Sequence, residues 1–179
     1  MPEIPRVRLA MPAEAAAIAE VQRAAWSSNP LLAPAIAGLS LADATQIWHQ
    51  VIVRPPLAHY RVLVALDEHR VVGFAFIGPS DDGDADPTDS LVHEFAIAGP
   101  DQRRGHGARL MQAAVDTMRL DGYERATWWV GSSDDVLRGW STQAGWAPDG
   151  AHREIGDDEG GVRLKQVRLH TDIRTDDPA

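Results

Sequence analysis

The chain has 179 residues, of which 44% are hydrophobic and 24% are charged, and this composition is typical of one globular domain that can bury roughly 70% of its unfolded surface. The formal net charge of −9 argues against nucleic-acid and anionic membrane surfaces as partners, and the absence of cysteine excludes disulfides, thiolate metal sites and a cysteine nucleophile. Apolar runs are too short to span a bilayer and the N-terminus lacks an apolar signal core, so we expect a cytoplasmic protein.

The N-terminal half is expected to place two helices between a first strand and a β-hairpin. Pro12 and Glu14 open an alanine-rich amphipathic helix, Asn29-Pro30 breaks it, and Ser40 is the expected N-cap of the second helix. The predicted elements are a strand at 7–9, a helix at 12–26, a loop at 30–38, a helix at 41–53, and strands at 61–66 and 71–77 joined by a turn at 67–69.

The C-terminal half alternates strands with helices and ends in a second hairpin. Gly122 and Gly145 are the glycines expected to end two of its helices. The predicted elements are a strand at 91–98, a helix at 108–120, a strand at 126–130, a helix at 134–144, and strands at 146–155 and 162–173. Residues 1–174 are therefore expected to form one domain, with 175–179 as a frayed tail.

The turn between the strand at 91–98 and the next helix carries the clearest functional motif, Gln102-Arg103-Arg104-Gly105-His106-Gly107. Glycine has no Cβ, so backbone N–H groups in such a turn can approach a phosphate, and the helix start adds its positive end. A dinucleotide fingerprint would need a third glycine where Leu110 stands, and a P-loop would need a Lys followed by Ser or Thr. The pattern that fits is Q-x-x-G-x-G/A, which predicts a phosphorylated cofactor.

This motif resembles the pyrophosphate-binding turn of the GNAT superfamily of acyl-CoA-dependent N-acyltransferases. The predicted order β-α-α-β-β-β-α-β-α-β-β is also similar to that of the GNAT fold over nearly the whole chain. Four further landmarks carry the resemblance: Val7-Arg8-Leu9-Ala10 with Pro12-Ala13-Glu14-Ala15, the segment from Arg70 to Ala75, Phe95-Ala96-Ile97, and Gln143-Ala144-Gly145-Trp146. The resemblance implies an α/β fold, with a mixed central sheet of about seven strands flanked by about four helices.

The resemblance also implies that acetyl-CoA is the acyl donor and that no metal takes part. In the family, the strand at 95–97 splays from the strand at 128–130, and the cofactor lies between them. A backbone amide of the first strand then stabilises the oxyanion of a tetrahedral intermediate. The residues implied at the cofactor are Phe95, Ala96, Ile97, Gln102, Arg103, Arg104, Gly105, His106, Gly107 and Ala108, together with Asp134, which stands where the family usually has Asn.

Acetyl transfer needs a base for the protonated amine, and two candidates are adjacent. His93 is the first, because its reference pKa of about 6.5 suits neutral pH; Glu94 is the second, and a water chain is the third. Strict alternation places His93 on the face of Phe95 and opposite Glu94, although a bulge would change which of them faces the substrate. The general acid is open, because Ser141 stands where the family usually has Tyr and a serine hydroxyl is a far weaker acid.

Acidic loops and tryptophans add further expectations. The acidic loops at 81–89 and 157–159 are interpreted as solvated segments that aid solubility. The second loop is also considered as a negative rim of the acceptor site that attracts cationic amines. Trp128 and Trp129 alternate along their strand, so one is expected in the core and the other at the cleft or a partner surface.

Three functional hypotheses follow. The leading one is an N-acetyltransferase that moves an acetyl group from acetyl-CoA to a primary amine, either of a small molecule, cationic amines included, or of a protein. The alternatives are a CoA-binding module whose catalytic centre has decayed and a toxin-type acetyltransferase of aminoacyl-tRNA, which the charge of −9 disfavours. No nucleic-acid or membrane partner is expected. The acceptor, the length of the acyl group and homodimer formation are left open.

Overall fold

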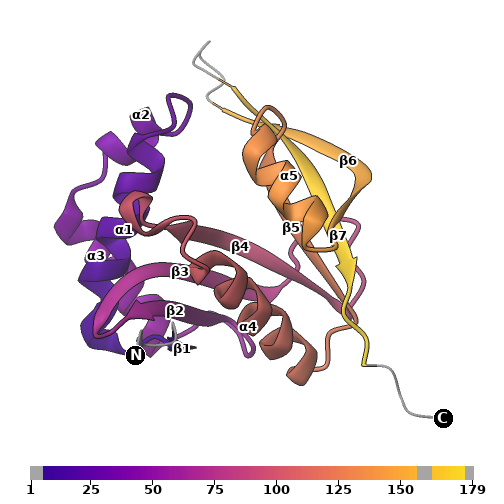
Figure 1. Ribbon diagram of the computed structural model, residues 1–179, viewed down its shortest axis with the longest axis horizontal. Coiled ribbons are helices and arrows are strands. Elements are labelled where there is room, and N and C mark those ends of the chain that lie inside the picture. Colours follow the sequence, from indigo (N-terminus) through magenta and orange to yellow (C-terminus); the bar gives the residue numbers. More distant parts are fainter. Residues whose placement is uncertain (1–5, 157–162, 176–179) are drawn as a thin grey trace.

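In the computed structural model, which describes residues 6–156 and 163–175, the strands of these residues form one seven-stranded sheet in the order β1-β2-β3-β4-β5-β7-β6 (Figure 1). β4 and β5 run parallel, and the other neighbouring pairs are antiparallel. The strands are β1 (Arg6–Leu9), β2 (Arg61–Asp67), β3 (Arg70–Pro79), β4 (Asp89–Ile97), β5 (Arg125–Gly131), β6 (Ala147–Ile155) and β7 (Leu164–Asp172). The predicted mixed α/β fold is confirmed.

Helices follow the predicted order, and α2 and the short 3-10 turn η2 are additions. They are the 3-10 turn η1 (Pro12–Glu14), α1 (Ala15–Ser27), α2 (Ala33–Ala37), α3 (Leu41–Val53), the 3-10 turn η2 (Gly99–Asp101), α4 (His106–Leu120) and α5 (Asp135–Gln143). α3 has the predicted bounds, and the Ser40 side chain accepts from the Asp43 amide at 3.0 Å as an N-cap. The prediction of a loop over 30–38 is wrong, because Pro34 sets a helical φ in the first turn of α2 and burial of Ile36 stabilises it.

The two faces of the sheet bury different cores. On one face, α4 presents Leu110, Met111, Ala114 and Met118 to the sheet, and this core continues under α5 to Trp128 and Trp146. On the other face, α1 and α3 cover β2 and β3 with a second core that includes Ile18, Trp48 and Phe74. Figure 1 shows α1 and α3 at one end of the sheet and α5 over the strands at the other end.

β4 and β5 are paired only where they begin. The parallel register joins Asp89–Val92 to Arg125–Trp128, whereas β4 continues to Ile97 and β5 to Gly131. In Figure 1 the two strands diverge beyond this pairing. The predicted splay is therefore present, and backbone groups of β4 after Val92 have no partner on β5.

A β-bulge in β4 changes the direction of its side chains. Phe76 of β3 pairs with Glu94, but the next residue, Ile77, pairs with Val92, so that His93 is the extra residue. Strict alternation would have placed His93 beside Phe95 on the α4 face. That prediction is wrong: the His93 ring lies 5.3 Å from the ring of Phe76, a residue of the α1–α3 face, and Glu94 points to the same face.

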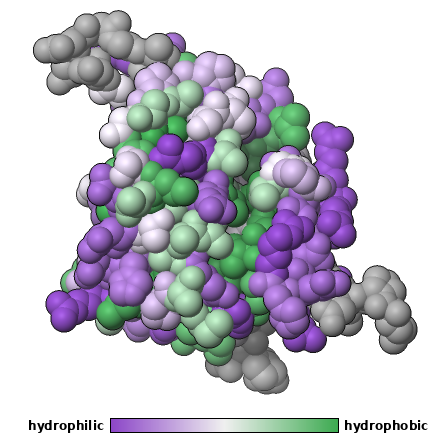
Figure 2. All heavy atoms as spheres, turned by 90° about the vertical axis from the view of Figure 1, so that its left-hand side faces the viewer, coloured by the Kyte–Doolittle hydropathy of each residue, from purple (hydrophilic) through white to green (hydrophobic). Residues whose placement is uncertain are grey.

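The outer surface of the helical end mixes residue types. Figure 2 looks onto the left-hand side of Figure 1, where hydrophilic and hydrophobic residues are interspersed. The exposed large apolar side chains of α3 and the loop that follows it are Leu41, Ile47, Val53 and Leu57. Within residues 6–156 and 163–175, no helix combines the length and the hydropathy that a bilayer crossing needs.

Candidate active site

The glycine turn has the geometry of an anion cradle. Arg103 and Gly105 both adopt positive φ, 62° and 88°, and Gly105 is the N-cap of α4. Glycine suits the left-handed conformation at this cap, and the first free amides of α4 follow it. A Cβ on Gly107 would lie 3.7 Å from Ile97 Cγ1 and 3.8 Å from Trp140 Cζ2. The start of α4 therefore faces the splay between β4 and β5.

The side chains of this turn have separate roles. Gln102 Nε2 donates to the Ile97 carbonyl at 3.1 Å, which ties the turn to the end of β4. His106 is buried, with 2% of its surface exposed, and its Nδ1 has no hydrogen-bond partner. Arg103 and Ala108 are exposed. The turn therefore presents free backbone amides at the start of α4 and the exposed charge of Arg103, while Gln102 ties it to β4.

Arg104 belongs to an ion-pair cluster behind the turn. Arg70 binds both oxygens of the buried Asp101 at 2.9 Å, and Arg104 lies 3.3 Å from Asp101 and 3.4 Å from Asp67. These arginines hold the pKa of Asp101 below its ordinary value. Asp67, Asp101 and His106 lie close enough for a metal site, but both carboxylates are occupied by guanidinium groups. We interpret the cluster as structural.

Aromatic residues fill the base of the splay. The Phe95 ring packs 5.4 Å from Trp128 and 6.0 Å from Trp140, and Phe95, Ala96 and Ile97 are all partly buried. Asp134 caps α5, because its carboxylate accepts from the Leu137 amide at 3.0 Å. Its observed role is to fix the start of the helix that carries Trp140.

Glu94 is held by neutral donors from α1. Its Oε1 accepts from Gln22 Nε2 and Trp26 Nε1, both at 2.9 Å, and its Oε2 accepts from Gln22 at 3.0 Å. Trp48 Nε1 in turn donates to Gln22 Oε1 at 3.0 Å. Burial raises the pKa of Glu94 above its ordinary value, and the hydrogen bonds from Gln22 and Trp26 oppose that rise only in part. No cation from the described part of the chain neutralises this carboxylate.

His93 lies in an aromatic setting beside it. Its ring is 5.3 Å from the rings of Tyr60 and Phe76, and its Nε2 lies 3.1 Å from the Pro79 carbonyl. A carbonyl only accepts, so Nε2 carries the proton and Nδ1 is left as the acceptor. Burial lowers the pKa of His93 below its ordinary value. The bulge thus brings both candidate bases to one face.

Ser141 is poorly placed to act as an acid. It is fully buried in α5, and its hydroxyl donates to the Leu137 carbonyl at 2.7 Å within the same helix. The proton is thereby committed to the backbone, as is common for serine in a helix interior.

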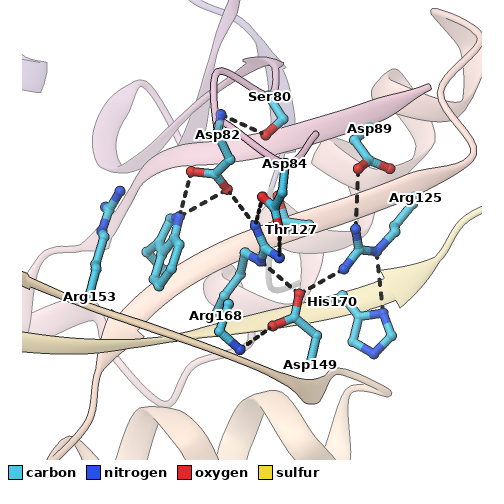
Figure 3. Close-up of polar contacts among 12 residues, drawn as sticks. Ser80, Asp82, Asp84, Asp89, Arg125, Thr127, Asp149, Arg153, Arg168 and His170 are labelled. Carbon is cyan, nitrogen blue, oxygen red and sulfur yellow. Dashed lines mark hydrogen bonds and ion pairs between the residues drawn. The ribbon is translucent and has the colours of Figure 1, made fainter. Parts of the chain in front are cut away.

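The acidic loop between β3 and β4 is not simply solvated, in contrast to the prediction. Arg168 of β7 is buried and binds both oxygens of Asp84 at 2.6 and 2.7 Å, Asp149 at 2.7 Å and Asp82 at 3.2 Å (Figure 3). Arg125 joins the same network through Asp89 and Asp149. The loop is therefore fastened across β5 and β7. The other acidic loop, 157–159, lies outside the described residues.

Trp129 belongs to this network, whereas Trp128 lies in the core. Trp129 Nε1 donates to both oxygens of Asp82, at 3.0 and 3.1 Å. Trp128 is 4% exposed and packs against Trp146. The prediction that one of the two packs in the core is confirmed for Trp128. The sequence analysis missed Gln22 and Trp26. The one signal for them was their spacing, which places two side chains with hydrogen-bond donors on the same face of the amphipathic helix α1.

Comparisons with known proteins agree with this geometry. A model of the acetyltransferase (GNAT) family matches residues 22–145. Among curated proteins, no sequence matches the chain. Similar solved structures include yncA of Salmonella typhimurium with its cofactor acetyl-CoA (19% identity, 99% of this chain and 98% of that chain covered, TM-score 0.75), an N-acetyltransferase of Staphylococcus aureus Mu50 (13%, 96% and 100%, 0.77) and the paiA N-acetyltransferase of Thermoplasma acidophilum in complex with coenzyme A (14%, 95% and 99%, 0.65).

Proposed function

This chain belongs to the acetyltransferase (GNAT) family, and from that membership we propose that it transfers an acetyl group from acetyl-CoA to a primary amine by direct attack. The observation that carries the proposal is the Glu94 carboxylate, which is desolvated, oriented by neutral donors and placed where β4 diverges from β5. A GNAT chain reduced to cofactor binding would have no need of such a carboxylate.

The donor side of the site is formed by the splay and the glycine turn. The pyrophosphate would lie against the amides that follow Gly105, with Arg103 adding positive charge. The thioester would lie along Phe95–Ile97, whose backbone has no β5 partner. A free amide there can donate to the developing oxyanion, which is typically worth about 3–4 kcal/mol.

Glu94 is the better placed of the two bases. A base must have a free lone pair directed at the amine, and from the described residues Glu94 Oε2 accepts one hydrogen bond, that of Gln22. A raised pKa also makes the carboxylate a stronger base near neutral pH. His93 is held by Pro79 and two aromatic rings, and its lowered pKa makes it a weaker base. We therefore assign proton removal from the ammonium to Glu94 and the wall of the acceptor site to His93.

The departing thiolate needs no protein acid in this account. A thiol with a pKa of about 8.5 leaves as a stable anion, so collapse of the tetrahedral intermediate can proceed without Ser141. Glu94 takes one proton from the ammonium and passes it to solvent, and the free amine then forms the C–N bond. The nitrogen of the tetrahedral intermediate loses its second proton to solvent as the C–S bond breaks and the thiolate departs.

A screen for free thiol release tests the function. Purified protein is mixed with acetyl-CoA and a panel of amines, and thiol is measured as it forms. We expect release that depends on both protein and amine. Tight binding of acetyl-CoA by calorimetry with no release for any amine would show the alternative, a module that binds the cofactor without turnover.

A further inference from the structure

Arg153 on β6 is held in place by two contacts, and within the described part of the chain most of its donors have no other partner. Its guanidinium carbon lies 4.3 Å from the centroid of the Trp129 ring. Its Nε donates to Gln166 Oε1 at 2.8 Å. The indole and Gln166 together fix the plane of the guanidinium while using one of its five N–H groups.

Within residues 6–156 and 163–175, Arg153 makes no ion pair. Arg125 and Arg168 each bind carboxylates, and Figure 3 shows Arg153 at the edge of that network, on the side away from Arg125. Asp82 and Asp81 attract the guanidinium from a distance, and both oxygens of Asp82 are already bonded to the Trp129 indole. Among residues 6–156 and 163–175, the four terminal N–H groups of Arg153 thus have no hydrogen-bond partner and can bind an anion.

Arg153 lies on the same face of the sheet as the two candidate bases. Gln166 pairs with both Arg153 and Gly131, and Gly131 shares a face with Trp129 by alternation. This face is opposite to the core residue Trp128, whose β4 partner is Val92. His93 and Glu94 also point away from that core. Burial is the main cause of the lowered pKa of His93, and the charge of Arg153 adds to it.

We propose that Arg153 binds a carboxylate carried by the acceptor, so that the preferred acceptors are amines of the amino-acid type. The inference rests on the proposed function, because it places the acceptor amine at Glu94 and its acid group at Arg153. A guanidinium pre-oriented by an indole ring suits bidentate binding of a planar carboxylate. This preference for acceptors with a carboxylate differs from the expectation of cationic acceptors, which depended on the acidic residues 157–159.

The test compares L-amino acids with their carboxamides as acceptors. Each pair differs in the carboxylate alone, and thiol release from acetyl-CoA gives KM and kcat for both members. The variants are Arg153→Gln, Arg153→Lys and, as a matched control, Lys165→Gln, which removes one positive charge from the opposite face of the same hairpin. The wild-type protein should favour the acids. Arg153→Gln should raise the KM of the acids roughly 10- to 100-fold, with little change in kcat or in the KM of the amides.

Partial recovery in Arg153→Lys and no effect of Lys165→Gln would support carboxylate binding over a merely structural role. Equal KM values for acids and amides in the wild type, or an equal rise for both in Arg153→Gln, would overturn the inference and leave acetyl transfer intact. If none of the amines gives thiol release, the proposed function is overturned instead. In that case, calorimetry measures the binding of N-acetyl-L-amino acids to the CoA-bound protein. Binding that occurs in the wild type and is lost in Arg153→Gln supports the carboxylate subsite. Binding that is absent in the wild type, or unchanged in Arg153→Gln, refutes it.

Discussion

The side-chain nitrogen of Gln22 lies 2.9 and 3.0 Å from the two carboxylate oxygens of Glu94, and it joins helix α1 to the bulge of β4. Trp48 holds the other end of the same amide. The orientation of the proposed base is therefore set by the helical layer that packs on β2 and β3. Changes within that layer should reach the chemistry through Gln22.

Replacing Gln22 by leucine should shift the pH dependence of catalysis. The lost hydrogen bonds favour the charged carboxylate, so the pKa of Glu94 should rise further. The acid limb of the kcat/KM profile should move to higher pH, and misplacement of the base should lower kcat by up to roughly 100-fold. Glu20→Gln, on the exposed side of α1, is the control. An acid limb that stays in place would show that Gln22 does not act on Glu94.

Glu94→Gln should make the protein more stable near neutral pH. The folded-state pKa of Glu94 is above its unfolded value near 4.5, so its favourable contribution is complete below that value and is lost as pH rises through the folded pKa. The amide avoids the cost of burying a charge, and each kcal/mol gained should raise Tm by roughly 2–4 °C. Calorimetry across pH should show the difference from wild type shrinking in acid. A variant less stable at neutral pH would contradict this.

Gly107→Glu should abolish acetyl-CoA binding without unfolding the chain. A Cβ fits at this position in ordinary contact with Ile97 and Trp140, so the backbone tolerates it. The added carboxylate then occupies the splay and repels the pyrophosphate. Gly139→Glu adds the same charge at an open position of α5 and should bind acetyl-CoA normally. Unchanged affinity in a folded Gly107→Glu protein would remove the phosphate cradle from this turn.

Arg168→Leu should be strongly destabilising. The change leaves Asp82 and Asp149 without their buried partner, a loss of about 3–5 kcal/mol that should lower Tm by roughly 10 °C. Arg163→Leu removes an exposed pair with Glu154 and should cost less than about 1 kcal/mol. Equal melting temperatures for the two variants would show that the network does not hold the acidic loop in place.

The same network gives the protein a defined acid sensitivity. Arg168 lowers the pKa of Asp84 from 3.8 to about 2. The stability that Asp84 contributes is therefore present above pH 3.8 and is lost as pH falls toward 2. Asp84→Asn should remove this dependence, and acid unfolding curves of the two proteins measure it. Overlapping curves would contradict the assignment.

Most of the fold could be predicted because its signals are local. Ser40 caps α3, and Gly105 adopts the left-handed conformation that begins α4, as residue chemistry requires. The order of the elements, through its resemblance to the GNAT fold, then predicted a mixed sheet of about seven strands. α2 was missed because its stability comes from burial of Ile36, a tertiary effect that the proline-rich pattern of the segment conceals.

The site was harder to predict, since its decisive contacts join distant segments. The bulge at His93 depends on pairing with β3 and is invisible in the β4 sequence alone. Gln22 lies 72 residues from Glu94, and Arg168 lies 84 residues from Asp84. No periodicity connects such positions. The acidic loop was accordingly interpreted as solvated, although its carboxylates are largely bound by arginine.

The most direct test of this account is the turnover of Glu94→Gln and His93→Ala with acetyl-CoA and an accepted amine. Removal of the base should lower kcat by roughly 10²–10⁴ in Glu94→Gln, with a smaller loss in His93→Ala. Acetyl-CoA affinity, measured in parallel, should be the same in both variants. If Glu94→Gln keeps the kcat of the wild type, or if kcat falls further in His93→Ala than in Glu94→Gln, Glu94 is not the base.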